Sequence, residues 1–488
     1  MLVRFYAMKF TNYITALTFL CTLYGCSNKN SVTEQFPEPA IQPDTNSSKI
    51  VYWLTTRDES ALLSRRPAIP YSSGVTTNPT VTIDTTQTFQ TMDGFGYTLT
   101  SGSATLINKM EVSAKSKLLN ELFGDDENSI HVSYIRISIG ASDLSANVYT
   151  YDDMPAGQTD PNLDNFSLLP DKTDLIPLLK EIIAINPEIK IIATPWTPPV
   201  WMKDNGNSIG GSLKPEFYSA YANYFVKYVQ AMKAEGIEIT AITPQNEPLH
   251  DGNNPSMKME ATQQADFIKN HLGPAFQFSG IATKIIVYDH NCDKPDYPLT
   301  ILNDPAAKSF VDGSAFHLYA GDISALSQVH NAHPDKSVYF TEQYTASTSQ
   351  FGGDLQWHIK NLVIAAPRNW SRTVFEWNLA NDVNFGPHTA GGCTTCKGAL
   401  TIDGSAVKRN VAYYIIAHIS KFVPAGSVRV GSNISGSLQN IAFKTPVGKK
   451  TLIVLNEADT VSSFNITFSG KTAPASLPAR GVATYVID

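Results

Sequence analysis

The sequence predicts an α/β protein, a (β/α)8 TIM barrel with an attached β-sandwich that is built from both chain ends. In the middle of the chain, strand-like and helical patterns alternate, as in parallel βα units. Before and after this part, short strand-like runs follow one another without helices, which is typical of a sandwich. We therefore expect residues 49–90 and 425–488 to form the sandwich and residues 91–424 to form the barrel.

The composition is that of a large globular protein and argues against some partners. The 488 residues are 42% hydrophobic and 17% charged, which is enough to bury a large core. A net charge of -7 without a basic patch makes nucleic acid an unsuitable partner. The 21 Tyr, 23 Phe and 6 Trp suit carbohydrate faces, but they suit a large core equally well.

Residues 1–25 are predicted to be a signal peptide of the lipoprotein type. A basic start precedes an apolar run, residues 13–24, and the stretch ends in Leu-Tyr-Gly-Cys with Cys26 last. Cys26 would be the lipidated first residue of the mature chain and its anchor in the outer membrane. Polar, Pro-rich residues 26–48 would be a tether. The alternative is an ordinary signal peptide, because the Tyr in this box is bulkier than usual. Either way we expect export, to the bacterial surface or the periplasm.

Eight strand candidates can be counted in the barrel region. They are residues 90–96, 133–139, 190–194, 239–243, 284–288, 313–317, 338–342 and 373–377. Helical patterns lie between them, such as residues 172–185 and 215–235, each with apolar side chains at three- and four-residue spacing. Eight such units are the number that closes a barrel.

The fourth strand candidate ends in residues 243–248, Thr-Pro-Gln-Asn-Glu-Pro, so a carboxylate stands where a buried strand stops. Pro248 excludes helical geometry at Glu247. Polar and aromatic side chains follow the other strands in the same way: Asp93, Arg136, Ser142, Asp143, Trp196, Trp201, Asn246, Asp289, His290, His317, Tyr319, Glu342, Glu376, Trp377 and Asn378. Because the active site of a barrel lies at the C-terminal ends of its strands, this common placement predicts a site.

Glu247 and Glu342 are the candidates for catalysis. Glycoside hydrolysis needs two carboxyl groups across the scissile bond, and a buried carboxyl beside another has the raised pKa that a general acid requires. A retaining mechanism predicts that the groups lie ~5–5.5 Å apart, whereas ~8 Å would contradict it. The alternative for the pair is a salt bridge that closes the barrel.

Other chemistries fit less well. The chain contains no Gly-x-Ser-x-Gly elbow, and Leu99 stands where a dinucleotide fingerprint beginning at Gly94 needs glycine. Asp289, His290 and Cys292 could imitate a metal cluster, but contact with a sugar is favoured. His317 is open between core packing and contact with a hydroxyl group. We expect no metal and no cofactor.

Cys393 and Cys396 are separated by two residues in a Gly-rich stretch. A zinc site with four sulfur ligands is excluded because a second pair is missing. A redox motif needs a thioredoxin-like context that the chain lacks. A local disulfide is the favoured interpretation.

Several motifs in the right order resemble glycoside hydrolase family 30, which includes glucosylceramidases and β-1,6-glucanases. They are residues 91–96 (TMDGFG), 134–137 (YIRI), 142–143 (SD), 194–203 (TPWTPPVWMK), 245–248 (QNEP), 340–342 (FTE), 378–380 (NLA) and 420–424 (SKFVP). The resemblance runs from about residue 50 to the C-terminus.

The resemblance implies a retaining mechanism with Glu247 as acid/base and Glu342 as nucleophile. The sugar on the non-reducing side would be lined by Arg136, Asp143, Trp196, Asn246, His317, Tyr319 and Trp377. Asp143 would bind hydroxyl groups, Asn246 the 2-hydroxyl, and Trp377 would form a wall. Leu318 and Gln343-Tyr344 depart from the family pattern, so the aglycone side is not defined by it.

We expect an exported retaining enzyme that cleaves β-linked glucose by double displacement. β-1,6-Glucan is the first choice of substrate, because a tethered bacterial lipoprotein meets polysaccharide more readily than ceramide. A glucosylceramidase or aryl-β-glucosidase is the alternative, and xylan or galactan cleavage is a third. A surface glycan-binding protein without catalysis is the alternative from another class, and the presence of both glutamates argues against it.

Overall fold

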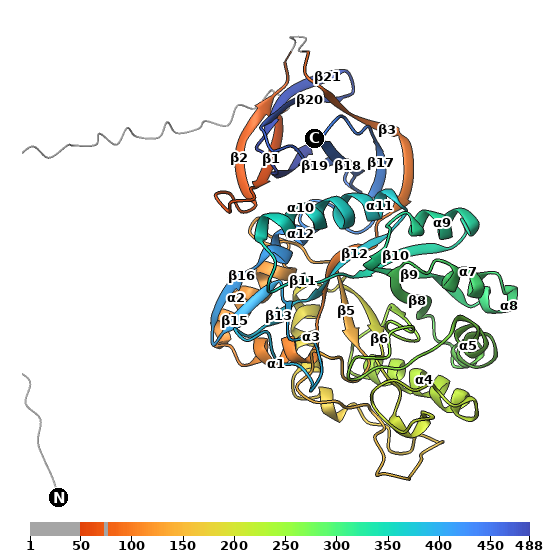
Figure 1. The fold of residues 1–488 in the computed structure, drawn as a ribbon. Coiled ribbons are helices and arrows are strands. Elements are labelled where there is room, and N and C mark those ends of the chain that lie inside the picture. Colours follow the sequence, from red (N-terminus) through yellow and green to blue (C-terminus); the bar gives the residue numbers. More distant parts are fainter. Residues whose placement is uncertain (1–48, 73–76) are drawn as a thin grey trace, which may run out of the picture. The chain divides into compact units, whose positions relative to one another are not determined.

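The computed structural model describes residues 49–72 and 77–488. The predicted signal peptide, the tether and Cys26 lie outside the described residues. The described part contains the predicted barrel and the predicted sandwich (Figure 1).

Eight parallel strands form the barrel. They are β4 (Gly94–Thr98), β5 (Tyr134–Ser138), β6 (Lys190–Thr194), β7 (Ala241–Ile242), β8 (Lys284–Cys292), β9 (Val311–Gly321), β10 (Ser337–Glu342) and β12 (Thr373–Asn378). Their order is β10-β9-β8-β7-β6-β5-β4-β12. The ring closes between β10 and β12, where the Arg372 amide donates to the Val338 carbonyl at 2.9 Å. The predicted barrel is therefore confirmed.

Helices follow the barrel strands along the chain. They are α1 (Ser101–Asn108), α2 (Val112–Phe123), α3 (Leu175–Ile185), α4 (Tyr218–Ala234), α5 (Ala261–Phe267), α6 (Gly273–Phe278), α7 (Asp296–Leu302), α8 (Pro305–Lys308), α9 (Ala325–Ala332), α10 (Phe351–His358), α11 (Ala366–Arg368) and α12 (Val411–Ser420). Helix α4 is an example of how the sequence forms them. Tyr221, Tyr224, Phe225 and Tyr228 are fully buried on one face of this helix. Gly236, with φ of 81°, follows its C-terminal end. Among the described residues, no helix is long and apolar enough to cross a membrane.

Both ends of the chain build the sandwich. Its strands are β1 (Lys49–Thr55), β2 (Ser64–Pro70), β3 (Thr80–Thr91), β17 (Val428–Ser432), β18 (Leu438–Lys444), β19 (Lys450–Asn456), β20 (Ser462–Phe468), β21 (Lys471–Leu477) and β22 (Val482–Ile487). Their order is β2-β1-β22-β19-β18-β17-β3-β20-β21. The sheet curls around a core that includes Val81, Leu452 and Phe464. The two outer strands approach each other where the Ser72 amide donates to the Thr472 carbonyl.

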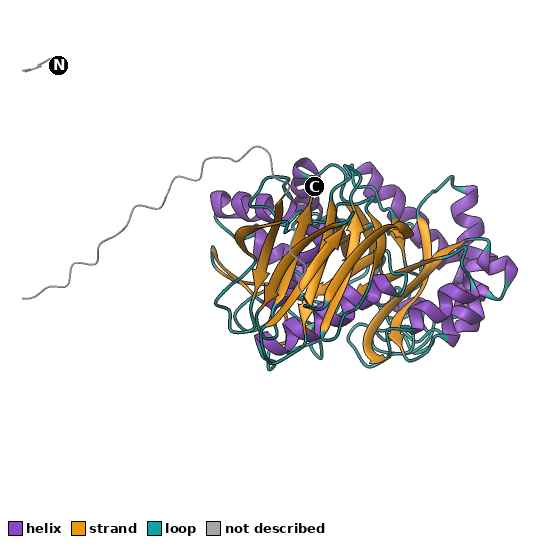
Figure 2. Cartoon of the chain, turned by 90° about the horizontal axis from the view of Figure 1, so that it is seen from above, coloured by secondary structure: helices purple, strands orange, loops and turns teal. Residues whose placement is uncertain are grey.

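Buried hydrogen bonds join the sandwich to the barrel helices. Figure 2 looks onto the sandwich and shows its strands in front of the helices. His418 of α12 bonds the hydroxyl groups of Thr55 and Thr484, at 2.8 and 2.9 Å. Burial lowers the pKa of His418 to about 3, so this ring is a neutral structural link.

The first barrel strand was predicted incorrectly. Residues up to Thr91 continue the sandwich strand β3, and the barrel strand β4 begins at Gly94, whose φ is 148°. Asp93 therefore lies at the N-terminal end of β4, opposite the predicted site. There it forms ion pairs with Lys190 and Arg372, which stand at the starts of β6 and β12. Asp93 is thus a structural link between strands.

Candidate active site

The barrel interior is layered, because alternate side chains of a strand point to the same side. An apolar layer consists of Tyr134, Ile192, Ala241, Ile286, Ala315, Tyr339 and Phe375. Two residues further along six of the same strands stand Arg136, Thr194, Thr243, His317, Thr341 and Trp377. The polar site therefore lies directly above the apolar filling, toward the C-terminal ends of the strands.

Strand β8 breaks this alternation and thereby supplies Asp289. Its register is irregular between Tyr288 and His290, and Tyr288 and Asp289 have φ of 76° and 63°. Tyr288 then packs against the rings of Tyr297 and Phe316, while Asp289 enters the barrel interior. Asp289 was predicted to follow the fifth strand and to contact the sugar, but the bulge instead places it fully buried beneath the cavity, and a bulge of this kind has no pattern in the sequence.

The carboxylate of Asp289 organises the polar layer. It is hydrogen-bonded to Arg136 at 2.9 Å, to His317 at 3.1 Å and to Thr341 at 2.6 Å. Two further threonines, Thr194 and Thr243, donate to it. Burial alone would raise its pKa, but the charge of Arg136 and these hydrogen bonds hold the pKa of Asp289 well below its ordinary value. The ionised form of Asp289 is therefore favoured despite its burial.

Arg136 connects three acidic or polar partners while fully buried. Its guanidinium donates to Glu342 Oε2 at 2.5 Å, to Asn246 Oδ1 at 2.6 Å and to Asp289. It also lies 5.1 Å from the ring centroid of Trp196. This planar, multidentate contact fixes the carboxylate of Glu342 in one orientation.

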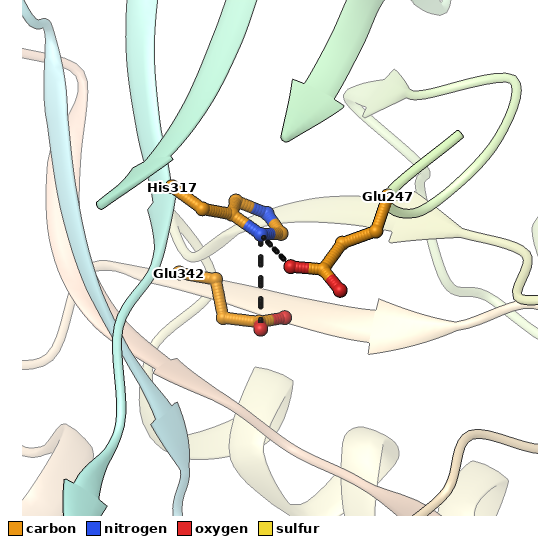
Figure 3. Close-up of side chains that lie close together, drawn as sticks. All are labelled: Glu247, His317 and Glu342. Atoms are coloured by element: carbon orange, nitrogen blue, oxygen red, sulfur yellow. Dashed lines mark hydrogen bonds and ion pairs between the residues drawn. The ribbon is translucent and has the colours of Figure 1, made fainter. Parts of the chain in front are cut away.

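Glu247 and Glu342 face each other across His317 (Figure 3). His317 Nδ1 lies 3.0 Å from Glu247 Oε1 and 3.8 Å from Glu342 Oε1. The Tyr319 hydroxyl donates to Glu342 Oε1 at 3.0 Å. A carboxylate oxygen of Glu247 lies within 4.8 Å of a carboxylate oxygen of Glu342. This spacing agrees with the ~5–5.5 Å of a retaining pair and not with the ~6.5–9.5 Å of an inverting pair.

The backbone of Glu247 is not in the right-handed helical region, in agreement with the position of Pro248. Its φ is 43°, in the left-handed region. The Glu247 amide donates to the Asp289 carbonyl at 3.0 Å, which ties this strained turn to the bulge in β8.

Protons in the site are distributed by His317. Although burial would lower its pKa, the charge of Glu342 and hydrogen bonds to Asp289 and Glu247 raise the pKa of His317 to about 9. Its charge holds the pKa of Glu247 below the ordinary value despite burial. Burial raises the pKa of Glu342, against the charges of His317 and Arg136. The raised carboxyl pKa expected of the general acid is therefore not on Glu247 in the ligand-free site.

Above these groups lies an open cavity of about 160 Å³. It is lined by Asp143, Trp196, Asn246, Glu247, Asn253, Tyr319, Glu342, Tyr344, Trp377, Cys393 and Cys396. Of the nine residues predicted for catalysis and sugar contact, seven are in this lining. Arg136 and His317 are fully buried beneath it. The rings of Trp196 and Trp377 lie 5.4 Å apart and form one wall.

Four lining residues were not predicted. Asn253 and Tyr344 stand just after Glu247 and Glu342 in the sequence, and that proximity is the pattern that could have identified them. The predicted local disulfide is present between Cys393 and Cys396, but its place in the cavity was not foreseen. Glu376 is also corrected, because it is buried against His358 at 2.7 Å and does not line the cavity.

Among the described residues, one group has the spacing of a metal site, and it is Glu247, His317 and Glu342. Both ring nitrogens of His317 are hydrogen-bonded to carboxylates, those of Glu247 and Asp289, which are also the contacts that proton transfer needs. The suggested cluster of Asp289, His290 and Cys292 does not form a site of this kind in the described chain.

A (β/α)8 barrel whose mouth holds two buried carboxyl groups at this spacing defines a retaining glycoside hydrolase. The comparison with protein families agrees. Residues 92–423 match the glycosyl hydrolase family 30 TIM-barrel domain and residues 426–485 match its beta sandwich domain. The chain therefore belongs to glycosyl hydrolase family 30.

Known relatives carry two kinds of name. The chain is 35% identical to endo-1,6-beta-D-glucanase neg1 of Aspergillus fumigatus, over 82% of this chain and 85% of that protein. It is 31% identical to lysosomal acid glucosylceramidase of Mus musculus, over 81% of each chain. Among solved structures, the endo-beta1,6-glucanase BT3312 is similar with a TM-score of 0.84 and 35% identity, over 90% of this chain and 99% of that one.

Proposed function

We propose that this protein hydrolyses β-1,6-linked glucan by double displacement, cutting within the chain. The carboxyl spacing supports the retaining mechanism. The linkage rests on the comparisons: the three relatives named endo-1,6-beta-glucanases are 34–38% identical to this chain, whereas those named glucosylceramidases are 27–31% identical.

Glu342 is the nucleophile in this proposal. Arg136 and Tyr319 fix its carboxylate, so it attacks the anomeric carbon from one side and forms a glycosyl ester. Glu247 protonates the departing oxygen and then removes a proton from the water that hydrolyses the ester. Two inversions at the same carbon leave the product in the β configuration.

His317 supports this cycle by storing the proton. It remains protonated up to about pH 9 and lies 3.0 Å from Glu247, so the pair holds the proton that the leaving group requires. Once Glu342 has formed the ester, its negative charge is gone. The pKa values of Glu247 and His317 then change, and Glu247 must change from acid to base at this point of the cycle.

The lining supplies contacts for the sugar. Asn246 accepts from Arg136 through Oδ1, which leaves its amide group for the 2-hydroxyl of the bound glucose. Asp143 faces the cavity to accept other hydroxyl groups, and Trp196 and Trp377 offer apolar faces. We assign Tyr344, half-buried beside Tyr319, to the leaving-group side.

Product analysis tests the proposal. Wild type, Glu342→Gln and Thr394→Ala, an exposed position, are incubated with β-1,6-glucan and, in parallel, with an aryl β-glucoside. We expect short β-1,6-linked oligosaccharides, first released as the β anomer, from wild type and Thr394→Ala only. Release of glucose from the aryl glucoside with the polymer untouched would instead support a glucosylceramidase-like activity. Binding of the polymer without any turnover would support a glycan-binding protein.

We also propose that the enzyme is exported and anchored through a lipid on Cys26. The lipoprotein-type sequence before Cys26 supports this proposal. Mass spectrometry of the mature N-terminus should find a diacylglycerol thioether on Cys26, and Cys26→Ser should release active enzyme from the membrane fraction. An unmodified N-terminus at another residue would contradict the proposal.

A further inference from the structure

The disulfide between Cys393 and Cys396 lines the same cavity as Asp143. It closes a short loop between β13 (Ala380–Asn381) and β15 (Leu400–Asp403). Its two cysteines differ in how the rest of the protein holds them, and this difference suggests what the bond does.

Cys396 is firmly anchored. It begins β14 (Cys396–Lys397), which pairs with β11 (Thr345–Ala346), and its carbonyl accepts the side-chain amide of Asn381 at 2.7 Å. Its side chain belongs to an apolar cluster with Leu144, Trp196 and Trp377. Cys396 is therefore fixed to the tryptophan wall of the cavity.

Cys393 instead holds Asp143. Its backbone amide donates to Asp143 Oδ2 at 3.3 Å, and among the described residues no other residue is hydrogen-bonded to this carboxylate. Gly392 lets the chain come this close, because a Cβ at that position would lie 2.3 Å from the Asp143 carbonyl oxygen. The Thr389 amide donates to the same carbonyl oxygen at 2.9 Å.

We propose that the Cys393–Cys396 disulfide is a positioning device for Asp143. It ties the amide that orients this carboxylate to a cysteine that is built into the tryptophan wall of the cavity. The inference rests on the proposed function in one respect, the contact of Asp143 with hydroxyl groups of the bound sugar. Without the covalent bond, Cys393 keeps only its half-buried packing against the cluster of Leu144, Trp196 and Trp377, and no longer holds Asp143 at the angle that the sugar requires.

A double-mutant cycle tests this role. The variants are Cys393→Ser/Cys396→Ser, Asp143→Ala and the triple substitution, with Thr394→Ala as a control that keeps the disulfide. Two quantities are measured for each: kcat and KM on an aryl β-glucoside, and the Kd of 1-deoxynojirimycin, a glucose-configured iminosugar, from the fluorescence of the cavity tryptophans. We expect Cys393→Ser/Cys396→Ser to raise the Kd and to lower kcat/KM about tenfold each in the wild-type background. In the Asp143→Ala background the same two substitutions should change neither quantity by more than about twofold.

The cycle separates positioning from general loosening of the fold. An equal loss with and without Asp143 would overturn the inference, as would full activity of the serine pair. If the serine variant does not fold, wild type is treated with dithiothreitol, which becomes a cyclic disulfide as the two thiols form. The same rise in Kd is then expected in wild type but not in Asp143→Ala. Wild type that binds the iminosugar but cleaves no β-glucoside would contradict the proposed function, while the Kd cycle would still decide the role of the disulfide.

Discussion

The two ends of the barrel each carry an ion cluster that joins several strands, and the clusters differ in charge balance. At the N-terminal end, Asp93 is shared by Lys190 and Arg372 at 3.1 and 2.9 Å, so cations are in excess and partly exposed. At the mouth, the buried carboxyl groups of Glu247, Asp289 and Glu342 pair with Arg136 and His317, and the buried carboxyl group of Asp143 lies close enough for the charge of Glu342 to act on it.

The cluster around Asp93 has a structural role, whereas the cluster at the mouth is suited to catalysis. Asp93 has a lowered pKa, because its hydrogen bonds and ion pairs with Arg372 and Lys190 outweigh burial, and it does nothing but hold strands together. At the mouth, the hydrogen bond and charge of His317 lower the pKa of Glu247 against burial, whereas burial raises the pKa of the neighbouring Glu342. Strained backbone at Glu247 and Asp289 occurs at this end as well. An unbalanced buried cluster is costly for stability and is what acid/base catalysis requires.

The largest effect is expected for Glu342→Gln. Removing the nucleophile should lower kcat by about 10⁴-fold or more, because no glycosyl ester can form. The measurement is steady-state turnover of an aryl β-glucoside, with circular dichroism to show that the variant is folded. Glu376→Gln is the matched control, since this buried glutamate lies outside the cavity. A comparable loss of turnover in a folded Glu376→Gln would contradict the assignment of Glu342 as nucleophile, because loss of any buried glutamate would then have the same effect.

Glu247→Gln should cost less, about 10²–10⁴-fold in kcat, the range of general acid–base catalysis. The loss should depend on the leaving group, because a nitrophenolate needs no proton to depart whereas a sugar hydroxyl does. Comparing 4-nitrophenyl β-glucoside with a β-1,6-linked disaccharide therefore checks the role. Azide, which needs no general base, should restore turnover of the aryl glucoside in this variant but not in Glu342→Gln. An equal loss on both substrates would contradict an acid/base role.

The sequence predicts the mouth better than the joint between domains. Seven barrel strands are evident, because each is an apolar run followed by polar residues, and the catalytic pair ends two of them. The change from sandwich to barrel at Met92-Asp93 has no such pattern, since both sides are extended and apolar. The burial of Asp289 beneath the cavity was not predicted, because a bulge reverses the inward and outward positions. The contact between Cys393 and Asp143 joins residues 250 positions apart, which no local pattern encodes.

Asp143→Asn should stabilise the protein at alkaline pH. Burial, followed by the charge of Glu342, raises the pKa of Asp143 to about 7, against an ordinary 3.8. The folded state then binds this proton more tightly than the unfolded state, so wild-type stability falls as pH rises from about 4 to 7. One pKa unit corresponds to about 1.36 kcal/mol. The free energy of unfolding of Asp143→Asn, relative to wild type, should therefore be up to about 4 kcal/mol higher above pH 7 than at acid pH. Urea unfolding at pH 5 and pH 8 measures this; a gain that does not grow with pH would contradict it.

Asp93→Asn is expected to give the smallest effect and the opposite pH dependence. Losing a partly buried carboxylate that two cations share should cost about 1–3 kcal/mol at neutral pH and leave kcat unchanged. Because the folded pKa of Asp93 is lowered, its contribution is present above the ordinary value and is lost as pH falls through the folded pKa. The loss of unfolding free energy in Asp93→Asn should therefore become smaller at acid pH. The gain of unfolding free energy in Asp143→Asn also disappears there. If both substitutions showed the same sign at pH 8, charge balance would not be what distinguishes the two ends of the barrel.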